Sequence, residues 1–115
     1  MMKEYTNCKK ELTRKIQAKN RVVKCAELRF DDYNKIFKKT CRLPVNYTEK
    51  QHEYFLQSLD FAYNAKHGPQ CLFGTVWFTD GTWLERFECN GGEWWVHRVC
   101  PEIPGFLLQT ELKED

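Results

Sequence analysis

Two short glycine-containing dipeptides in the last third of the chain constrain its fold more than any other feature. Asp80-Gly81 separates the apolar run 72–79 from the run 82–90, and Gly91-Gly92 separates the second run from 93–99. Two-residue loops of these types supply the positive φ angles that tight antiparallel hairpins need. The sequence therefore predicts a three-stranded meander over this segment.

The two turns also predict the register of the meander. Thr79 should pair with Thr82 across the first turn, and Asn90 with Glu93 across the second. Because side chains alternate between the faces of a sheet, this register assigns every residue to a face. The expected inner face holds Leu72, Gly74, Val76, Phe78, Trp83, Phe87, Cys89, Trp94, Val96 and Cys100. The expected outer face holds Phe73, Thr75, Trp77, Thr79, Thr82, Leu84, Arg86, Glu88, Trp95, His97 and Val99.

The distribution of charged and apolar residues supports this register but leaves the outer face unexplained. Glu85 and Arg98, the only charges on the expected inner face, would lie directly opposite each other. The outer face is richer in large apolar groups than a solvated surface normally is. Either the N-terminal helix covers it or a partner protein does. In the second case the expected partner-binding residues are Phe73, Trp77, Leu84, Arg86, Glu88, Trp95 and His97.

Two helices are predicted in the first two thirds of the chain. An apolar stripe at helical spacing predicts a helix over 3–19, formed by Tyr5, Cys8, Leu12 and Ile16. Thr48 followed three residues later by Gln51 has the form of a capping box and predicts a second helix over 48–59.

Alternating apolar residues predict two further strands, over 22–30 and 35–45, joined by a turn at 31–34. The tail is expected to cross the edge of the sheet, with Ile103, Phe106 and Leu107 packed against it. The fold class is thus α+β in the order α-β-β-α-β-β-β, with an antiparallel sheet. At 115 residues the chain, 1–115, is expected to be a single domain.

The net charge of +2 conceals two halves of opposite sign. Through Arg42 there are 13 Lys and Arg against 5 Asp and Glu, and from Leu43 onward there are 5 against 11. A basic helix can contact phosphates, so nucleic-acid binding is the alternative function. The residues that would carry it are Lys9, Lys10, Arg14, Lys15, Lys19 and Arg21.

The six cysteines are expected to be reduced. The N-terminus has no apolar run typical of a secretory signal, and no apolar stretch approaches the roughly 20 residues that cross a bilayer. We therefore expect a cytoplasmic protein with free thiols, no membrane association and no cofactor. A zinc site formed by His67, Cys71, His97 and Cys100 is a less favoured alternative, because the spacing matches no standard module.

The sequence gives no sign of catalysis. The phosphate-binding motifs G-x-x-x-x-G-K-(S/T) and G-x-G-x-x-G do not occur. His97 and Cys100, a candidate base and thiol nucleophile, project to opposite faces of their expected strand. A non-catalytic protein-binding function is the prediction, since Trp, Tyr and Arg are the residue types that most often anchor interfaces. Whether the protein is a homodimer stays open.

One C-terminal pattern resembles a known group of proteins. The segments 79–83 (Thr-Asp-Gly-Thr-Trp), 90–95 (Asn-Gly-Gly-Glu-Trp-Trp) and 100–104 (Cys-Pro-Glu-Ile-Pro) are similar to a signature of small accessory proteins of tailed bacteriophages and prophages. The resemblance implies a bacterial host cytoplasm as the site of action. It also implies that the protein is an anti-CRISPR or other anti-defence protein, which inhibits a host protein or ribonucleoprotein effector complex.

Overall fold

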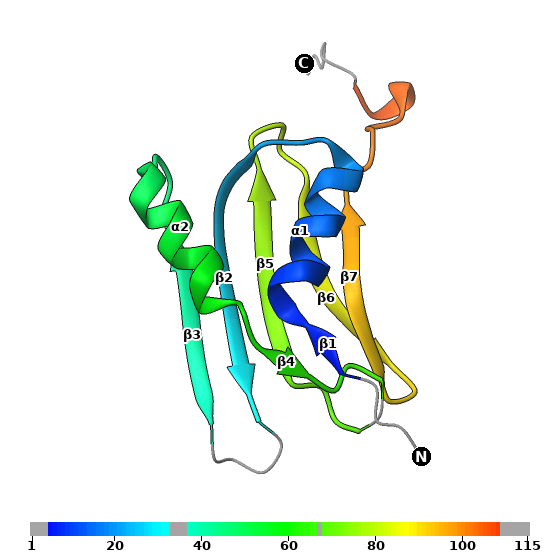
Figure 1. Ribbon diagram of the computed structural model, residues 1–115. Coiled ribbons are helices and arrows are strands. Elements are labelled where there is room, and N and C mark those ends of the chain that lie inside the picture. Colours follow the sequence, from blue (N-terminus) through cyan, green and yellow to red (C-terminus); the bar gives the residue numbers. More distant parts are fainter. Residues whose placement is uncertain (1–4, 33–36, 67, 109–115) are drawn as a thin grey trace.

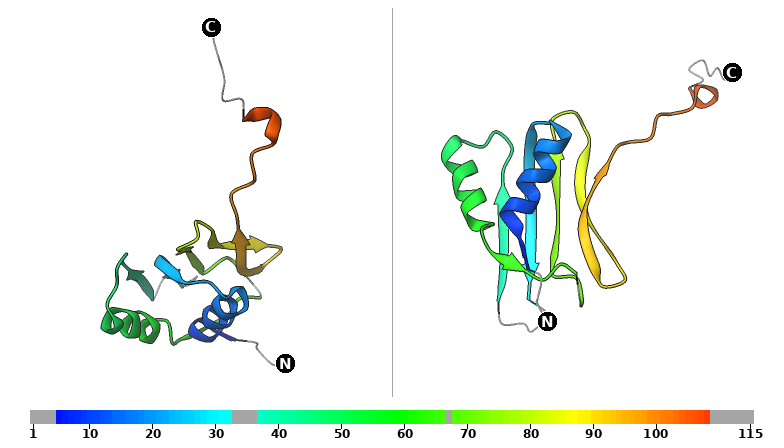
Figure 2. Two further views of the ribbon diagram at one scale, coloured as in Figure 1. Left: turned by 90° about the horizontal axis from the view of Figure 1, so that it is seen from above. Right: turned by 45° about the vertical axis from the view of Figure 1, so that its right-hand side comes forward.

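The computed structural model, which describes residues 5–32, 37–66 and 68–108, has two layers. A five-stranded antiparallel sheet forms one layer, and two helices packed on one of its faces form the other (Figures 1 and 2). The α+β class and the approximate order of elements expected from the sequence are therefore confirmed.

The large sheet has the strand order β3-β2-β5-β6-β7, and a small second sheet pairs β1 with β4. The elements are β1 (Thr6–Asn7), α1 (Cys8–Lys19), β2 (Val23–Asp31), β3 (Lys38–Leu43), α2 (Glu49–Ser58), β4 (Ala62–Tyr63), β5 (Leu72–Phe78), β6 (Trp83–Cys89), β7 (Gly92–Arg98) and a 3-10 turn (Gly105–Leu107).

Local hydrogen bonds set the ends of both helices. Asn7 accepts a hydrogen bond from the Lys10 amide at 2.9 Å and starts α1, and Asn20 ends it with a φ of 52°. The predicted capping box of α2 is confirmed: Thr48 accepts from the Gln51 amide at 3.1 Å, and the Gln51 side chain accepts from the Thr48 amide at 2.8 Å.

Some boundaries differ from those expected. The helix α1 begins at Cys8 rather than in the segment before it, so Tyr5 lies outside the helix and is exposed. The strands β1 and β4 were not predicted, because each is only two residues long. Of the turn predicted at 31–34, residues 33 and 34 lie outside the described residues. Asp31 is the last residue of β2, and Asp32 follows it.

The hydrophobic core lies between the helices and the sheet. Amphipathic faces of all the long elements contribute to it, as the alternation and the helical stripes predict. Its largest fully buried side chains are Leu12, Leu28, Leu43, Leu59, Leu72, Val76, Phe78 and Leu84.

The turn between β5 and β6 contains one residue more than predicted. Phe78 donates to the Thr82 carbonyl at 2.9 Å, so the loop comprises Thr79, Asp80 and Gly81. Thr79 does not pair with Thr82; its amide instead donates to the Val22 carbonyl beside β2 at 2.9 Å. The register expected for β5 and β6 is therefore wrong by one residue, and Trp77 lies opposite Trp83.

The turn between β6 and β7 uses Asn90 and Gly91 rather than Gly91 and Gly92. Both residues have positive φ angles, 52° and 83°, as a type I′ hairpin requires. Cys89 consequently pairs with Gly92, and the predicted pairing of Asn90 with Glu93 is wrong by two residues.

The single-residue shift exchanges the faces of β6 and β7. Only a shift by an odd number reverses the alternation, so β5 keeps its predicted orientation and the next two strands do not. Leu84, Arg86 and Trp95 point to the core, and Trp83, Phe87 and Trp94 to the opposite face. The expected pair of Glu85 and Arg98 does form, at 3.1 Å, but diagonally and on that opposite face.

The C-terminal segment does not cross the sheet edge as predicted. Residues 99–108 run away from the sheet and contribute no buried side chain (Figure 2). Ile103, Phe106 and Leu107 are 56%, 81% and 63% exposed, because no element of the domain lies within their reach.

Candidate binding surface

One face of the large sheet is covered by neither α1 nor α2 (Figure 2). The strand register places a row of aromatic side chains on this face. The register places them together: Trp77 pairs with Trp83, and Phe87 with Trp94. We call this surface the open face. Its aromatic residues are Phe73, Trp77, Trp83, Phe87 and Trp94.

Three of these rings are strongly exposed. The exposed fractions of Trp77, Phe87 and Trp94 are 41%, 40% and 43%, and the rings of Phe87 and Trp94 are 5.5 Å apart in a tilted arrangement. Such large apolar groups, placed together on the surface of a folded chain, mark interaction sites more often than single exposed ones do.

The charges of the open face are largely paired within it. Arg42 contacts Glu27 at 2.7 Å, and Arg98 contacts Glu85 at 3.1 Å. Between these pairs, the Arg29 guanidinium lies over the Phe73 ring, 4.5 Å from its centroid. The open face is thus an aromatic surface of mixed charge, without a block of one sign.

A hollow of about 330 Å³ adjoins Trp77 on the open face. Its lining includes Lys24, Cys25, Val45, Trp77 and Gly81. The hollow is the size of a large side chain, so it can receive an anchoring residue from a partner.

Some of the residues predicted to bind a partner lie on the surface, and others lie in the core. Phe73 and Trp77 lie on the open face. Glu88 is exposed near the end of β6, and His97 is half-buried with Nε2 at 3.0 Å from the Thr82 hydroxyl.

Three of the predicted partner-binding residues are not on the surface. Leu84, Arg86 and Trp95 are buried between the sheet and α1, so the prediction is wrong for them. The physical reason is the extra loop residue before β6, which reverses its faces. The same reversal places Trp83, Phe87 and Trp94 on the open face. The position of the second turn could have been predicted from the Asn90-Gly91 dipeptide, which is a strong hairpin signal.

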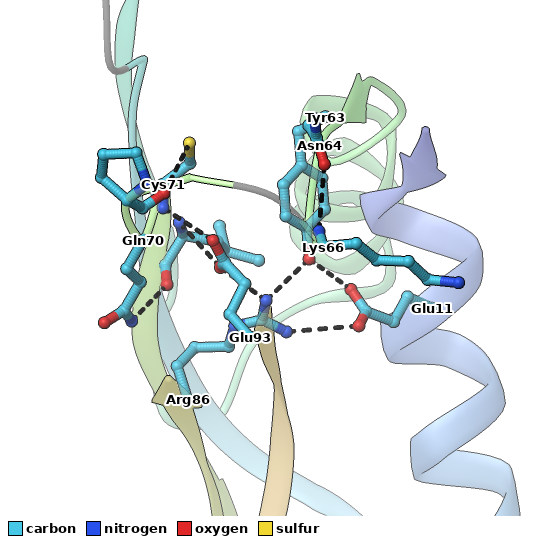
Figure 3. A network of polar contacts seen from close by, with 10 residues as sticks. Glu11, Tyr63, Asn64, Lys66, Gln70, Cys71, Arg86 and Glu93 are labelled. Atoms are coloured by element: carbon cyan, nitrogen blue, oxygen red, sulfur yellow. Dashed lines mark hydrogen bonds and ion pairs between the residues drawn. The ribbon is translucent and has the colours of Figure 1, made fainter. Parts of the chain in front are cut away.

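A buried polar network joins α1, β4, β6 and β7 around Arg86 (Figure 3). The Arg86 guanidinium is only 1% exposed and donates to Glu93 at 2.6 Å and to the Tyr63 hydroxyl at 2.7 Å. Its second terminal nitrogen, Nη1, contacts Glu11 at 3.3 Å, and Tyr63 donates to Glu11 at 2.6 Å. Glu93 also accepts hydrogen bonds from the backbone amides of residues 71 and 72.

This network links α1, β4, β6 and β7 through buried polar contacts. Burial raises the pKa of Tyr63 far above its ordinary value, so its hydroxyl stays neutral and acts as a hydrogen-bond donor and acceptor. Both carboxylates are engaged by donors, and the guanidinium has no contact with solvent. The arrangement therefore ties the elements together.

A second depression lies between α1 and the edge strand β7. It has a volume of about 400 Å³ and is lined by Glu11, Arg14, Lys15, Ala18, Trp94 and Trp95. We call it the helix–edge groove. It brings two of the residues predicted to bind nucleic acid, Arg14 and Lys15, beside tryptophan.

The other predicted nucleic-acid residues lie elsewhere on α1 or just after it. Lys9 and Lys19 are half-buried, and Lys10 is exposed. Arg21 binds Asp80 at 2.6 Å across the end of the sheet. Hydrogen bonds from Thr82, and then Arg21, lower the pKa of Asp80 to about 2.

The cysteines are free thiols in different environments. Burial raises the pKa of the Cys8 thiol to about 12, whereas Cys89 and Cys100 are exposed. Among residues 5–32, 37–66 and 68–108, no group of three or more His, Cys, Asp and Glu side chains is placed to hold a metal ion. His67, one of the four residues of the alternative zinc site, lies outside the described residues.

Neither helix of the described part of the chain has the length and apolar character needed to span a membrane. Architecture and surface together define a two-layer α+β protein with one covered and one open sheet face. Comparisons with protein-family models, with curated proteins and with solved structures give no match to this chain.

Proposed function

We propose that this is a non-catalytic binding protein that docks onto a partner protein through its open face. The observation that carries the proposal is the set of three strongly exposed aromatic rings on the side of the sheet that neither α1 nor α2 covers. Burying side chains of this size stabilises a complex by on the order of 1.5–3 kcal/mol each.

The charge arrangement favours a protein partner over a nucleic acid for this face. Its arginines are held by Glu27, Glu85 and the Phe73 ring, so few cations are left to neutralise phosphates. Aromatic anchors surrounded by polar groups that already have partners are typical of protein interfaces.

The resemblance of the C-terminal pattern to phage accessory proteins supports a finer proposal. On that basis the partner is a host protein or ribonucleoprotein effector complex in the bacterial cytoplasm, and docking inhibits it. The open face then competes for a surface that the effector needs.

The test is capture of a bacterial partner by the full chain, compared across matched variants. We expect Trp77→Ala and Phe87→Ala to weaken the complex by about 30-fold or more each, as interface anchors do. Tyr54→Ala, which removes an exposed aromatic ring from α2 in the other layer, is the control and should bind normally. Equal binding by all variants would reject the open face as the docking surface.

The oligomeric state is measured first, by light scattering on the purified chain. A dimer that Trp77→Ala dissociates would show that a second copy, rather than a host protein, occupies the open face.

A further inference from the structure

The helix–edge groove joins the two features that the sequence keeps far apart: the basic helix and the tryptophan-rich ribbon. Arg14 and Lys15 on α1 form one wall, and Trp94 and Trp95 on β7 form the other. The volume of about 400 Å³ lies within the range of small-ligand sites and fits a unit the size of one nucleotide.

Trp94 supplies an aromatic surface at the mouth of the groove. Its side chain is 43% exposed, whereas Trp95 beside it is buried and holds the strand in place. Every nucleic-acid base has a flat face that can stack on such a ring, provided the base is not paired in a duplex.

The positive charge of the groove continues along α1. Lys15 and Lys19 lie one helical turn apart and therefore project from the same side of α1. Lys19 is the last residue of α1, and Arg21, which is paired with Asp80 at 2.6 Å, follows it. A phosphate chain leaving the groove toward the end of α1 would follow this row.

Glu11, the one acidic residue among those lining the groove, is partly compensated from the core side. Arg86, which also binds Glu93, contacts Glu11 at 3.3 Å, and the Tyr63 hydroxyl donates to it at 2.6 Å. The positive charge of the groove therefore comes from Arg14 and Lys15, which outnumber this one carboxylate.

We propose that the helix–edge groove binds single-stranded nucleic acid, with a base stacked on Trp94 and the adjoining phosphates held by Arg14 and Lys15. This site is separate from protein docking through the open face, although Trp94 lies where the two surfaces meet.

The test measures binding of the full chain to a fluorescent oligothymidylate of about ten nucleotides by anisotropy. For about three neutralised phosphates, affinity should fall roughly 20-fold between about 50 and about 200 mM salt. Arg14→Gln with Lys15→Gln should weaken binding about tenfold and reduce the salt dependence, and Trp94→Ala should weaken it about tenfold with the salt dependence retained.

Three controls define the site. Lys50→Gln and Tyr54→Ala on α2 remove a cation and an exposed ring from outside the groove and should bind as the parent chain does. Trp77→Ala should also leave oligonucleotide binding unchanged, which separates failure of this proposal from failure of the proposed docking function. Each variant is compared with the parent chain by thermal unfolding, so that loss of the fold is recognised.

Several results would overturn the proposal. One is the absence of a complex at low salt, and another is undiminished binding by the Arg14 and Lys15 variant. Equal affinity for a duplex of the same length, without dependence on Trp94, would show general electrostatic attraction instead. Competition by thymidine monophosphate at concentrations equal to those of the oligonucleotide would assign the groove to a free nucleotide.

Discussion

Arg86 shows how a charged residue can lie in the interior of a domain this small. Its guanidinium has oxygen partners on Glu11, Tyr63 and Glu93, and it lies 5.0 Å from the centroid of the Trp95 ring. A buried cation is tolerated only when such partners offset the loss of hydration. The charge therefore depends on residues from three other elements, α1, β4 and β7.

Replacing Arg86 by alanine should lower the free energy of unfolding by about 3–5 kcal/mol. The substitution leaves the carboxylate of Glu93, only 2% exposed, buried beside Glu11 without a cation. Urea denaturation followed by tryptophan fluorescence measures the change.

A matched control is the ion pair between Arg42 and Glu27, whose side chains are 72% and 53% exposed. Arg42→Ala should change the free energy of unfolding by at most about 1 kcal/mol, because solvent screens such pairs. Similar losses for Arg42→Ala and Arg86→Ala would contradict the structural role of the buried network.

At the scale of single elements, β5 depends on a glycine for its approach to β2. Gly74 has a φ of 149°, and a Cβ placed there would lie 2.3 Å from the Glu27 carbonyl oxygen. The two central strands of the sheet would have to separate to admit any side chain.

Gly74→Ala should therefore destabilise the fold by more than about 3 kcal/mol, measured by chemical denaturation. Gly81→Ala meets no atom within 4 Å and suffers only from its φ of 91°, so about 1–2 kcal/mol is expected. Gly105→Ala has neither problem and should leave stability unchanged. Equal effects at Gly74 and Gly81 would show that the contact with β2 is not limiting.

Elements defined by local signals could be predicted from the sequence. The capping box of Thr48 and Gln51 marks the start of α2, and the alternation that ends at Phe30 marks β2, because both signals depend only on neighbours in the chain. The register of β5 and β6 could not be predicted. It depends on the bond from the Thr79 amide to the Val22 carbonyl, which joins distant segments and draws Thr79 into the loop.

The candidate surface was predictable in kind but not in its residues. Surplus aromatic groups on the meander indicated an uncovered face, and Phe73 and Trp77 do lie on it. Trp95 and Arg86 were misplaced because their burial needs α1 and Tyr63, which no pattern within the meander reveals.

For the molecule as a whole, the folded domain ends before its C-terminal segment. Replacing Phe106 and Leu107 together by serine should change the free energy of unfolding by less than about 0.5 kcal/mol, since both are exposed. Thermal and chemical unfolding measure this, and limited chymotrypsin digestion should cut this segment first. A loss of several kcal/mol would mean that the segment packs on the domain in solution.

The pairing of Phe78 with Thr82 decides which side chains of the last two strands are interior. Directly paired residues share a face of the sheet whatever the length of the loop between them. An insertion or deletion within 79–81 that keeps this pair therefore leaves Leu84, Arg86 and Trp95 in the interior, whereas a shift that pairs Thr79 with Thr82 would turn the ribbon inside out. Homologous chains with the same architecture should therefore vary in the length of this loop while keeping a core-facing residue directly before it.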